Sequence, residues 1–475
     1  MALETGHVLL LFLLVVMSYF FQEVNKQQPA PYMDEIFHIP QAQNYCSGHF
    51  NHWNKKITTL PGLYLSSQLF LKISTIFSDK GIESICDAKN LRLTNVIFIM
   101  GCATILRGIL RILCRTENNG KEEKDNKKAA ENDPDHQAKI LITSVVLTTF
   151  PLLFFFTFLY YTDVGSTFFV LFSYYFTLTN AHMLSAFTGV LAVFFRQTNI
   201  VWVGFNMATG ILIYLRRKRL IQEKSNLFQS IFDAVKGILA HYVDVLLIAI
   251  PYCIVFLSFL LFVIKNKGIV VGDRTSHEAS LNVPQLFYFS TFVMIYSSFL
   301  LYRYANIKNI WTDIKNIVTS PRKLLLCLLA IGVMLYLVHN FTYVHKYLIS
   351  DNRHYTFYIW KRIFEKHWAV KYALVPGYLL SWLIIFNELN KSNRSIWILL
   401  YLLCTAAVLV PQKLLEFRYF IIPYLLFRLH IGVRNYLELI TEFVLYMCVN
   451  AVTLYLFIYR PFKWDHEDAI QRFMW

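Results

Sequence analysis

The chain has 475 residues, of which 56% are hydrophobic, 17% aromatic and only 16% charged, and its mean hydropathy is +0.44. Soluble globular proteins carry roughly 25% charged residues, so this composition excludes a water-soluble domain. Apolar runs of near-spanning length recur from one end of the sequence to the other, and a spanning helix needs about 20 apolar residues. Because the runs are continuous rather than alternating, a membrane β-barrel is excluded as well. We therefore expect an all-α, polytopic membrane protein.

The formal net charge is +15, which raises the question of a nucleic-acid partner. Lys and Arg gather in the cytoplasmic loops of membrane proteins, and this accounts for the excess, so we expect no nucleic acid. The eight cysteines show no CxxC or Cys/His ligand spacing, and we expect no metal site. Cys46 and Cys86 lie in one non-spanning region and could form a disulfide if that region is oxidising.

The first apolar run covers residues 7–21. No small-residue cleavage site follows it, so we interpret it as an uncleaved first span rather than a signal peptide. The next unambiguous span covers 91–113. Between the two, residues 61–77 are apolar, but the run is short and is interrupted by Ser, Thr and Lys72.

The polar segment 115–139 sets the predicted topology. It has low complexity, and its composition predicts a disordered cytoplasmic loop. If the N-terminus is also cytoplasmic, residues 22–113 contain one crossing. The segment 61–77 then lies in or along the membrane interface, and 22–90 forms one long loop on the lumenal side.

If successive spans continue to alternate between the two sides of the membrane in this way, the sequence predicts about thirteen spans in a single integral membrane domain covering 1–475. After 7–21 and 91–113, the expected spans are 139–160, 164–180, 183–195, 198–215, 242–264, 283–302, 323–341, 370–388, 395–411, 413–430 and 438–459. Residues 91–264 form an N-terminal helical module, and 265–475 hold the remaining spans. The expected lumenal segments are 22–90, 160–163, 195–199, 265–282, 341–369 and 411–418. The informative polar motifs fall on this lumenal side.

Two adjacent acids, Asp34 and Glu35, precede His38 in the first lumenal loop. Neighbouring residues on a helix or strand point in different directions, so these acids cannot act as a paired carboxylate site. One of them can face a reaction while the other orients a substrate or bonds the backbone. An ionised Asp can accept a proton from an acceptor hydroxyl, as an inverting glycosyl transfer requires. Helix capping or simple solvation is the alternative.

The segment GDRTSHEAS at 272–280 combines both charges in a predicted lumenal loop. Arg274 and His277 can hold a phosphate, while Asp273 and Glu278 can accept hydrogen bonds from sugar hydroxyls. A plain solvated loop explains the segment equally well.

In SDNRHYTFYIWKR at 350–362, basic residues alternate with aromatic ones on the predicted lumenal side. Arg353 and His354 break the rule that basic residues stay cytoplasmic, which indicates an anionic group such as a lipid phosphate. Tyr355 and its neighbours can lie at headgroup level or stack on sugar faces, although interfacial anchoring explains the aromatics as well.

The segment PQKLLEFRYF at 411–420 places charged residues between apolar runs. Charges at membrane depth are costly and are usually functional or paired. Lys413 and Glu416 have a spacing at which they could form a salt bridge, and Arg418 follows. In FFRQTN at 194–199, Arg196 likewise lies in the membrane region.

With these residues in hand, the chain resembles the family of ER α-1,2-glucosyltransferases that use dolichyl-phosphate-glucose to add the last glucose to the lipid-linked N-glycan precursor. The resemblance rests on YMDEIFHIPQAQNYC, ITTLPGLY, FLYYTD, FRQTNI, GIVVGDR-SHEA, PQLFYF, FTYVHKYL-DNRHYTFY-WKR, VPQKLLEFRYFI-PY and QRFMW. These stretches run in order from residue 32 to 475. The departures lie in the first span, in 115–139 and in 216–240.

The resemblance implies a GT-C fold in the ER membrane, with an acidic motif on the first lumenal loop and an active site that faces the lumen. It implies a β-linked donor, dolichyl-phosphate-glucose, and an α-linked product on a dolichyl-diphosphate oligosaccharide. Inversion in one displacement requires one base and no nucleophile. We expect no cofactor, because a lipid phosphate leaving group held by Arg and Lys does not demand a metal.

Mapped onto this sequence, the resemblance makes Asp34 the expected general base and Glu35 the second choice, with a supporting role. The expected phosphate-binding residues are Arg353, His354, Lys413 and Arg418. The expected substrate-binding residues are His38, Asp273, Arg274, His277, Glu278 and Tyr355.

Two other functions share this hydropathy. A transporter would be expected to place ionisable residues near mid-membrane in broken helices, and no internal repeat is evident here. A membrane interaction protein that modulates a channel would need neither acids nor phosphate-binding cations. Another dolichyl-phosphate-sugar transferase, with a different sugar or acceptor, is the alternative within the enzyme class.

Overall fold

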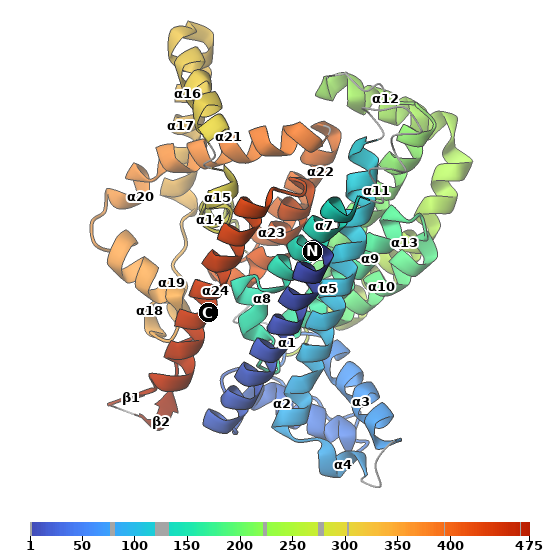
Figure 1. Cartoon of the computed structure of the whole chain (residues 1–475), viewed down its shortest axis with the longest axis vertical. Helices are drawn as coiled ribbons and strands as arrows, with labels where there is room; N and C mark the ends of the chain where they lie inside the picture. The colour runs from blue at the N-terminus through green and yellow to red at the C-terminus, as the bar shows by residue number, and fades with distance from the viewer. Residues whose placement is uncertain are drawn as a thin grey trace. The chain divides into compact units, whose positions relative to one another are not determined.

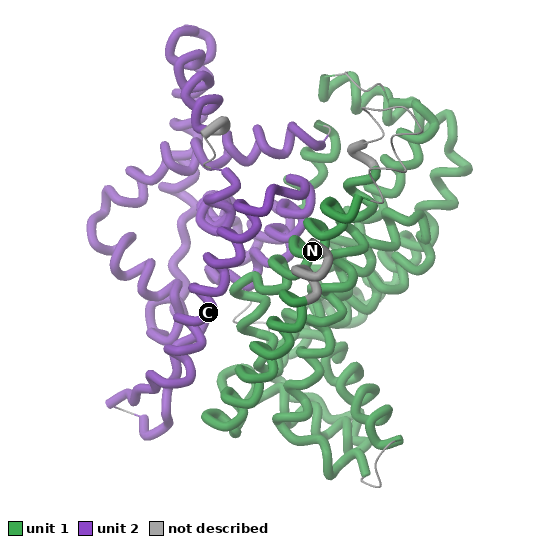
Figure 2. Tube along the Cα trace, viewed as in Figure 1, with its two compact units in different colours: residues 1–278, 394–404 green, residues 279–393, 405–475 purple. Residues whose placement is uncertain are grey.

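The computed structural model describes residues 2–76, 81–118, 133–221, 226–273, 280–301, 304–393, 395–465 and 467–475. Most of the predicted disordered loop lies outside these residues, and so do the candidate site residues Arg274, His277 and Glu278. The chain forms two compact units, shown in Figure 2. Unit 1 contains Met1–Glu278 and Arg394–Cys404, and unit 2 contains Ala279–Asn393 and Thr405–Trp475.

Unit 1 is built from helices alone in its described part (Figure 1). Its elements are α1 (Ala2–Gln27), α2 (Glu35–Cys46), α3 (Gly62–Thr75), α4 (Ile82–Ile85), α5 (Ala88–Asn118), α7 (Pro134–Thr148), α8 (Pro151–Phe156), α9 (Thr162–Leu178), α10 (His182–Phe195), η1 (Gln197–Asn199), α11 (Ile200–Arg217), α12 (Leu227–Ala240) and α13 (Tyr242–Asn266). Helix α9 is the centre of the unit, because it packs against α5, α10 and α11.

Unit 2 contains helices and one two-stranded antiparallel sheet. Its elements are α14 (Pro284–Tyr296), α15 (Ser298–Leu301), α16 (Tyr304–Thr319), α17 (Pro321–Phe341), α18 (Lys346–Ser350), α19 (Tyr355–Ile359), η2 (Trp360–Phe364), α20 (Val370–Ala373), α21 (Val375–Ser392), η3 (Phe417–Phe420), α23 (Ile421–His430), α24 (Tyr436–Tyr459), β1 (Phe462–Trp464) and β2 (Glu467–Gln471). Helix α22 (Ser395–Leu409) begins in unit 1 and ends in unit 2. The described part of the chain is thus all-α apart from one short hairpin.

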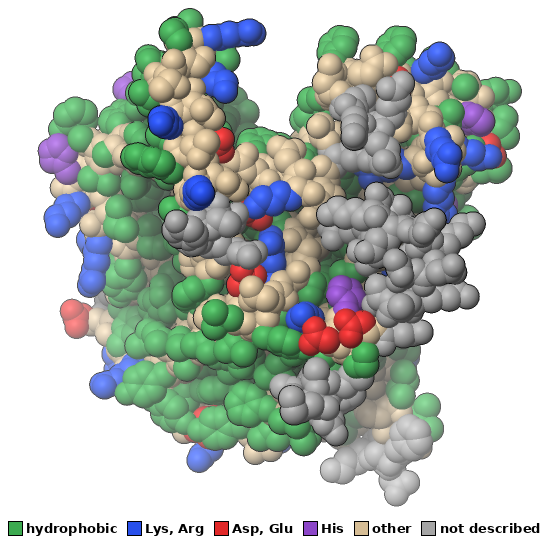
Figure 3. Space-filling view, turned by 45° about the horizontal axis from the view of Figure 1, so that its top comes forward, with side chains coloured by type: hydrophobic (Ala, Val, Ile, Leu, Met, Phe, Trp, Pro, Cys, Tyr) green, Lys and Arg blue, Asp and Glu red, His purple; other side chains and the backbone are tan. Residues whose placement is uncertain are grey.

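Seven helices of the described chain are long and apolar enough to cross a membrane, namely α1, α5, η1 with α11, α13, α17, α20 with α21, and α24. Two shorter apolar helices, α10 and α22, join them. Large apolar side chains are exposed along these helices, as on Leu247 and Leu329 at 64% and 56%, which is the surface that a lipid solvent requires. Figure 3 shows broad hydrophobic areas on the visible face. The expected multi-pass membrane protein is confirmed.

The count of thirteen spans is not confirmed. The expected spans 139–160 and 283–302 are each divided between two helices, α7 with α8 and α14 with α15. Helix α7 ends before Pro151, which lacks the N–H that a continuing helix would use. The expected span 413–430 is helical without interruption only in its second half, as α23.

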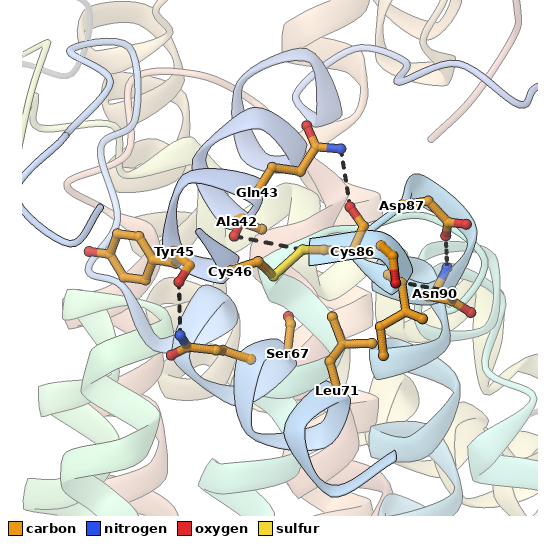
Figure 4. Close-up of a disulfide and its surroundings, with 12 residues drawn as sticks. Ala42, Gln43, Tyr45, Cys46, Ser67, Leu71, Cys86, Asp87 and Asn90 are labelled. Carbon is orange, nitrogen blue, oxygen red and sulfur yellow. Dashed lines mark hydrogen bonds between the residues drawn. A yellow bond between two sulfur atoms is a disulfide. The ribbon is translucent and has the colours of Figure 1, made fainter. Parts of the chain in front are cut away.

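The predicted lumenal loop, residues 22–90, contains three helices in its described part, namely α2, α3 and α4. A disulfide between Cys46 and Cys86 joins the end of α2 to the residue after α4 (Figure 4). Beside it, the Gln43 side chain donates to the Cys86 carbonyl oxygen at 3.1 Å. Helix α3, which covers the segment predicted to lie in or along the interface, has 14 residues and is too short to span.

Candidate functional site

The candidate base, Asp34, lies at the N-cap position of α2, where the chain turns into the helix after leaving α1. The residue before it, Met33, has a left-handed backbone with φ of 54°, which is uncommon for a residue with a side chain. The Asp34 side chain is half-buried and makes no capping hydrogen bond to its own helix, while its N–H donates to the Tyr161 hydroxyl at 3.2 Å. The positive end of the helix dipole favours a carboxylate here.

The second acid, Glu35, is fully buried and engaged on both carboxylate oxygens. One oxygen accepts from Arg92 Nε at 2.8 Å and from the Tyr160 N–H at 2.6 Å. The other accepts from Arg92 Nη2 at 2.6 Å and from the Tyr32 N–H at 3.0 Å. These contacts occupy both carboxylate oxygens and leave no position for a substrate proton, so the environments of the two adjacent acids differ sharply.

His38 lies one helical turn after Asp34, and its Nδ1 is 2.6 Å from the Tyr64 hydroxyl of α3. Burial raises the pKa of that hydroxyl well above its ordinary value, and Tyr160, Tyr45 and Asp34 add smaller contributions in the same direction. Tyr64 therefore remains protonated at neutral pH.

Three segments that the sequence places on the same side of the membrane meet in unit 1. The Thr58 carbonyl oxygen accepts from Gln197 Nε2 at 2.9 Å and from the Val271 N–H at 3.3 Å. Asp273 lies 3.9 Å from the exposed Lys56 ammonium. The structure thus brings this predicted substrate-binding residue to the segment between α2 and α3.

Arg196, which the sequence marked as a charge in the membrane region, forms an ion pair. Its Nη2 lies 2.9 Å from the buried carboxylate of Asp163, and its Nε lies 3.3 Å from the Thr162 hydroxyl. Sequence reasoning did not single out Asp163. A signal was present in the sequence, because an acid between two apolar runs, such as 139–160 and 164–180, is usually paired with a partner of opposite charge.

In unit 2, the candidate Arg353 is held by its own loop. Its guanidinium bonds both oxygens of Asp351 at 2.8 Å, bonds the Gln471 amide oxygen at 2.7 Å, and lies 4.7 Å from the Trp464 ring centre. Burial alone would raise the pKa of Asp351, but hydrogen bonds from His354 and Arg353 bring it well below its ordinary value. The positive charge of Arg353 is thus already balanced by the carboxylate of Asp351.

The last residues of the chain pack onto the next two candidates. His354 Nδ1 lies 2.6 Å from the backbone oxygen of Trp475, and the Met474 N–H donates to the Arg353 carbonyl oxygen at 2.8 Å. The Tyr355 ring centre lies 4.4 Å from that of Trp475, and its hydroxyl lies 2.8 Å from the Thr453 hydroxyl. Sequence reasoning recognised the terminal stretch but assigned it no role.

Around residue 413, the structure separates two candidate cations. Arg418 pairs with Glu416 at 2.7 Å, so the alternative of a Lys413–Glu416 salt bridge is wrong; the intervening segment is not helical, and the spacing does not bring the two together. Among the described residues, the half-buried Lys413 ammonium has no carboxylate partner.

The backbone around Lys413 is clamped by two buried amides. Asn282 and Gln285 are 2% and 0% exposed, and both donate to the Gln412 carbonyl oxygen, at 3.2 and 3.3 Å. Gln285 also donates to the Leu414 carbonyl oxygen at 3.0 Å. Lys413 therefore projects from a fixed backbone. In the described ranges, no three His, Cys, Asp or Glu side chains gather as they would around a metal ion.

Comparison with known proteins gives a consistent result. Residues 28–429 match the model of the DIE2/ALG10 family. Relatives named "Dol-P-Glc:Glc(2)Man(9)GlcNAc(2)-PP-Dol alpha-1,2-glucosyltransferase" occur in Homo sapiens, at 39% identity over 94% of this chain and 93% of the relative, and in Arabidopsis thaliana, at 34% over 95% and 96%. The relative from Drosophila melanogaster bears the same name, at 34% over 93% of both chains. No solved structure matches the chain. The protein described here belongs to the DIE2/ALG10 family.

Proposed function

We propose that this protein transfers glucose from dolichyl-phosphate-glucose to the 2-hydroxyl of the terminal glucose on diglucosylated, dolichyl-diphosphate-linked oligosaccharide. The observation that carries this proposal is near full-length similarity to glucosyltransferases of that name, together with a membrane fold that contains the acidic loop. The relatives' names give no support to the transporter or channel-modulating alternatives.

Asp34 is the proposed general base. In a single displacement, its carboxylate takes the proton of the acceptor 2-hydroxyl while that oxygen bonds to the anomeric carbon of the donor glucose. The bond from that carbon to the phosphate oxygen breaks, and dolichyl phosphate leaves with the electron pair. Attack from the opposite face converts a β-linked donor into an α-linked product, and one base is sufficient.

Glu35 has a supporting role in this proposal. Both its oxygens already accept two hydrogen bonds in a fully buried position, so taking a proton would break contacts with Arg92 and the backbone. Asp34, half-buried and without a capping bond to α2, is better suited to exchange a proton with substrate.

Lys413 is the strongest candidate for stabilising the charge that develops on the leaving phosphate. Its ammonium has no carboxylate partner in the described chain, whereas Arg353 and Arg418 each pair with an acid. A fixed cation aimed at developing charge contributes to catalysis because it needs no reorganisation during the reaction. His354, Tyr355, His38 and Asp273 remain proposed substrate contacts.

We place the acidic loop in the ER lumen. A disulfide between Cys46 and Cys86 supports this side, since disulfides persist in oxidising compartments and are rare in the cytosol. Asp34 and the disulfide lie in the same predicted loop, residues 22–90, so we expect them in the same compartment.

The deciding experiment is glucose transfer from a short-chain dolichyl-phosphate-glucose to the diglucosylated lipid-linked acceptor by purified protein. Wild type should transfer glucose, and Asp34→Asn should lose about 10²–10⁴-fold in kcat, the range for a lost general base, with the donor still bound. A mannose donor serves as the substrate control.

Two results would overturn parts of the proposal. A wild-type rate for Asp34→Asn would remove Asp34 as the base. Wild-type protein that transfers no glucose in a lipid environment where it is folded would refute the proposed reaction itself.

A further inference from the structure

Arg92 of α5 is a fully buried arginine with all five of its N–H donors in use. The Nε hydrogen and one of the two Nη2 hydrogens are donated to the Glu35 carboxylate, as described above. The other Nη2 hydrogen donates to the Ala30 carbonyl oxygen at 3.1 Å, and Nη1 donates to the Asn25 side-chain oxygen at 3.1 Å and to the Gln28 carbonyl oxygen at 2.7 Å. Arg92 therefore fixes the end of α1 and the linker that leads to α2.

Glu35 extends this network in the other direction. Its two remaining contacts are the N–H groups of Tyr32, just before α2, and of Tyr160, before α9. One Arg–Glu pair thus joins α5 to four other segments: the end of α1, the α1–α2 linker, the start of α2 and the chain before α9.

Asp34 directly precedes Glu35 and so lies beside this network. Its neighbour Glu35 is fixed by Arg92, and its own N–H donates to Tyr161, the residue after the Tyr160 that Glu35 holds. The strained backbone at Met33 needs support from its surroundings to persist. The bonds that Tyr32 and Glu35 make on either side of Met33 supply that support.

We propose that Arg92 is a positioning residue for the glucosyl transfer, which acts through Glu35 to fix the Asp34 carboxylate; this inference rests on the proposed function. The same contacts also contribute to stability, because Arg92 and Glu35 satisfy backbone groups besides each other, so the test must measure folding and rate separately. Positioning adds an effect on rate, since a misplacement of the base by about 1 Å can cost about 10²-fold.

The test compares two variants of the full-length protein in lipid nanodiscs. Arg92→Lys keeps the charge but has three donors on a flexible stem, so it cannot reach the same acceptors. The double variant Arg92→Met with Glu35→Leu removes both charges and keeps the volume. For each, we expect kcat per folded molecule to fall about 10²-fold with KM for both substrates unchanged.

Folding is measured separately from activity. The thermal unfolding transition and the Cys46–Cys86 disulfide, determined by mass spectrometry without reduction, report whether α2 is still folded. A merely structural role would lower the amount of folded protein but leave kcat per folded molecule at the wild-type value.

The chain supplies a matched control in a second fully buried pair. Arg428 on α23 bonds Glu442 on α24 at 2.9 and 2.8 Å. The corresponding variants, Arg428→Lys and Arg428→Met with Glu442→Leu, should change the melting temperature and leave kcat per folded molecule unchanged.

The outcomes are distinct. Wild-type kcat in the folded Arg92/Glu35 double variant overturns this inference and leaves the proposed base intact. Failure of both Arg92 variants to fold assigns the pair to folding alone and overturns it too. A fast Asp34→Asn in the same assay overturns the base assignment and this inference together.

Discussion

The Nδ1 atom of His354 lies 2.6 Å from the backbone oxygen of Trp475, a residue 121 positions further along the chain. The contact continues as a parallel bridge between His354 and Met474 and as a tilted ring contact between Trp475 and Tyr355. Met474 and Trp475 therefore pack against the loop that carries the three candidate site residues Arg353, His354 and Tyr355.

We predict that this packing of Met474 and Trp475 against the loop is needed for activity. Deleting residues 472–475 removes the contacts of Met474 and Trp475 with the loop, which should lower transfer at least tenfold and speed cleavage of 343–369 by protease. The Trp475→Ala variant, which keeps the backbone oxygen, should show a smaller loss. Unchanged proteolysis and activity after the deletion would contradict this role.

Asp351 gives a pH-dependent prediction. Its pKa in the folded protein is lowered by bonds from His354 and Arg353, so its contribution to stability is present at neutral pH and is lost as the pH falls below about 4. Asp351→Asn should lower Tm at pH 7, and the gap from wild type should shrink on acidification through that range. A gap that is constant from pH 7 to pH 3 would exclude the ionised pair as its cause.

For Lys413, we predict a catalytic rather than a structural effect. Lys413→Met should lower kcat about 10²–10³-fold, the usual cost of removing a group that stabilises developing charge, with little change in Tm. The control is Lys346→Met, a lysine whose ammonium lies 5.1 Å from the Tyr347 ring.

The clamp on Lys413 can be tested without touching the lysine. Gln285→Glu replaces the amide donor by an oxygen that faces the Gln412 and Leu414 carbonyl oxygens. It should reproduce part of the Lys413→Met loss in kcat. A folded Gln285→Glu protein with normal kinetics would show that the clamp does not position the lysine.

The disulfide gives a stability prediction. Cys46→Ser or Cys86→Ser should cost about 2–4 kcal/mol, because the bond restricts the unfolded chain between positions 40 residues apart. Loss of the bond should also lower activity, since it holds the far end of α2. Cys253→Ala, at an exposed free cysteine, is the control and should change neither property.

Much of the fold could be predicted from hydropathy, because apolar length maps directly onto spanning helices, as for 91–113 and α5. The interrupted spans could not be predicted in detail. Breaks such as that before Pro151 depend on neighbouring helices that satisfy the freed backbone groups, and a hydropathy pattern does not contain this information.

For the candidate site, charge and motif placed Asp34 and Glu35 in one loop but could not separate their environments. That separation depends on Arg92, which is 57 residues away in the sequence. The pairing of Arg418 with Glu416 rather than Lys413 with Glu416 was missed for a similar reason, since spacing rules assume a helix that does not form there.

The disulfide has a consequence for the order of events during synthesis. Both cysteines precede α5, so every atom of the bond has been made before most of the membrane helices exist. The Cys46–Cys86 disulfide of the segment that contains Asp34 can thus form while the ribosome is still adding the rest of the chain. A nascent chain trapped just after α5 should already resist alkylation at Cys46 and Cys86.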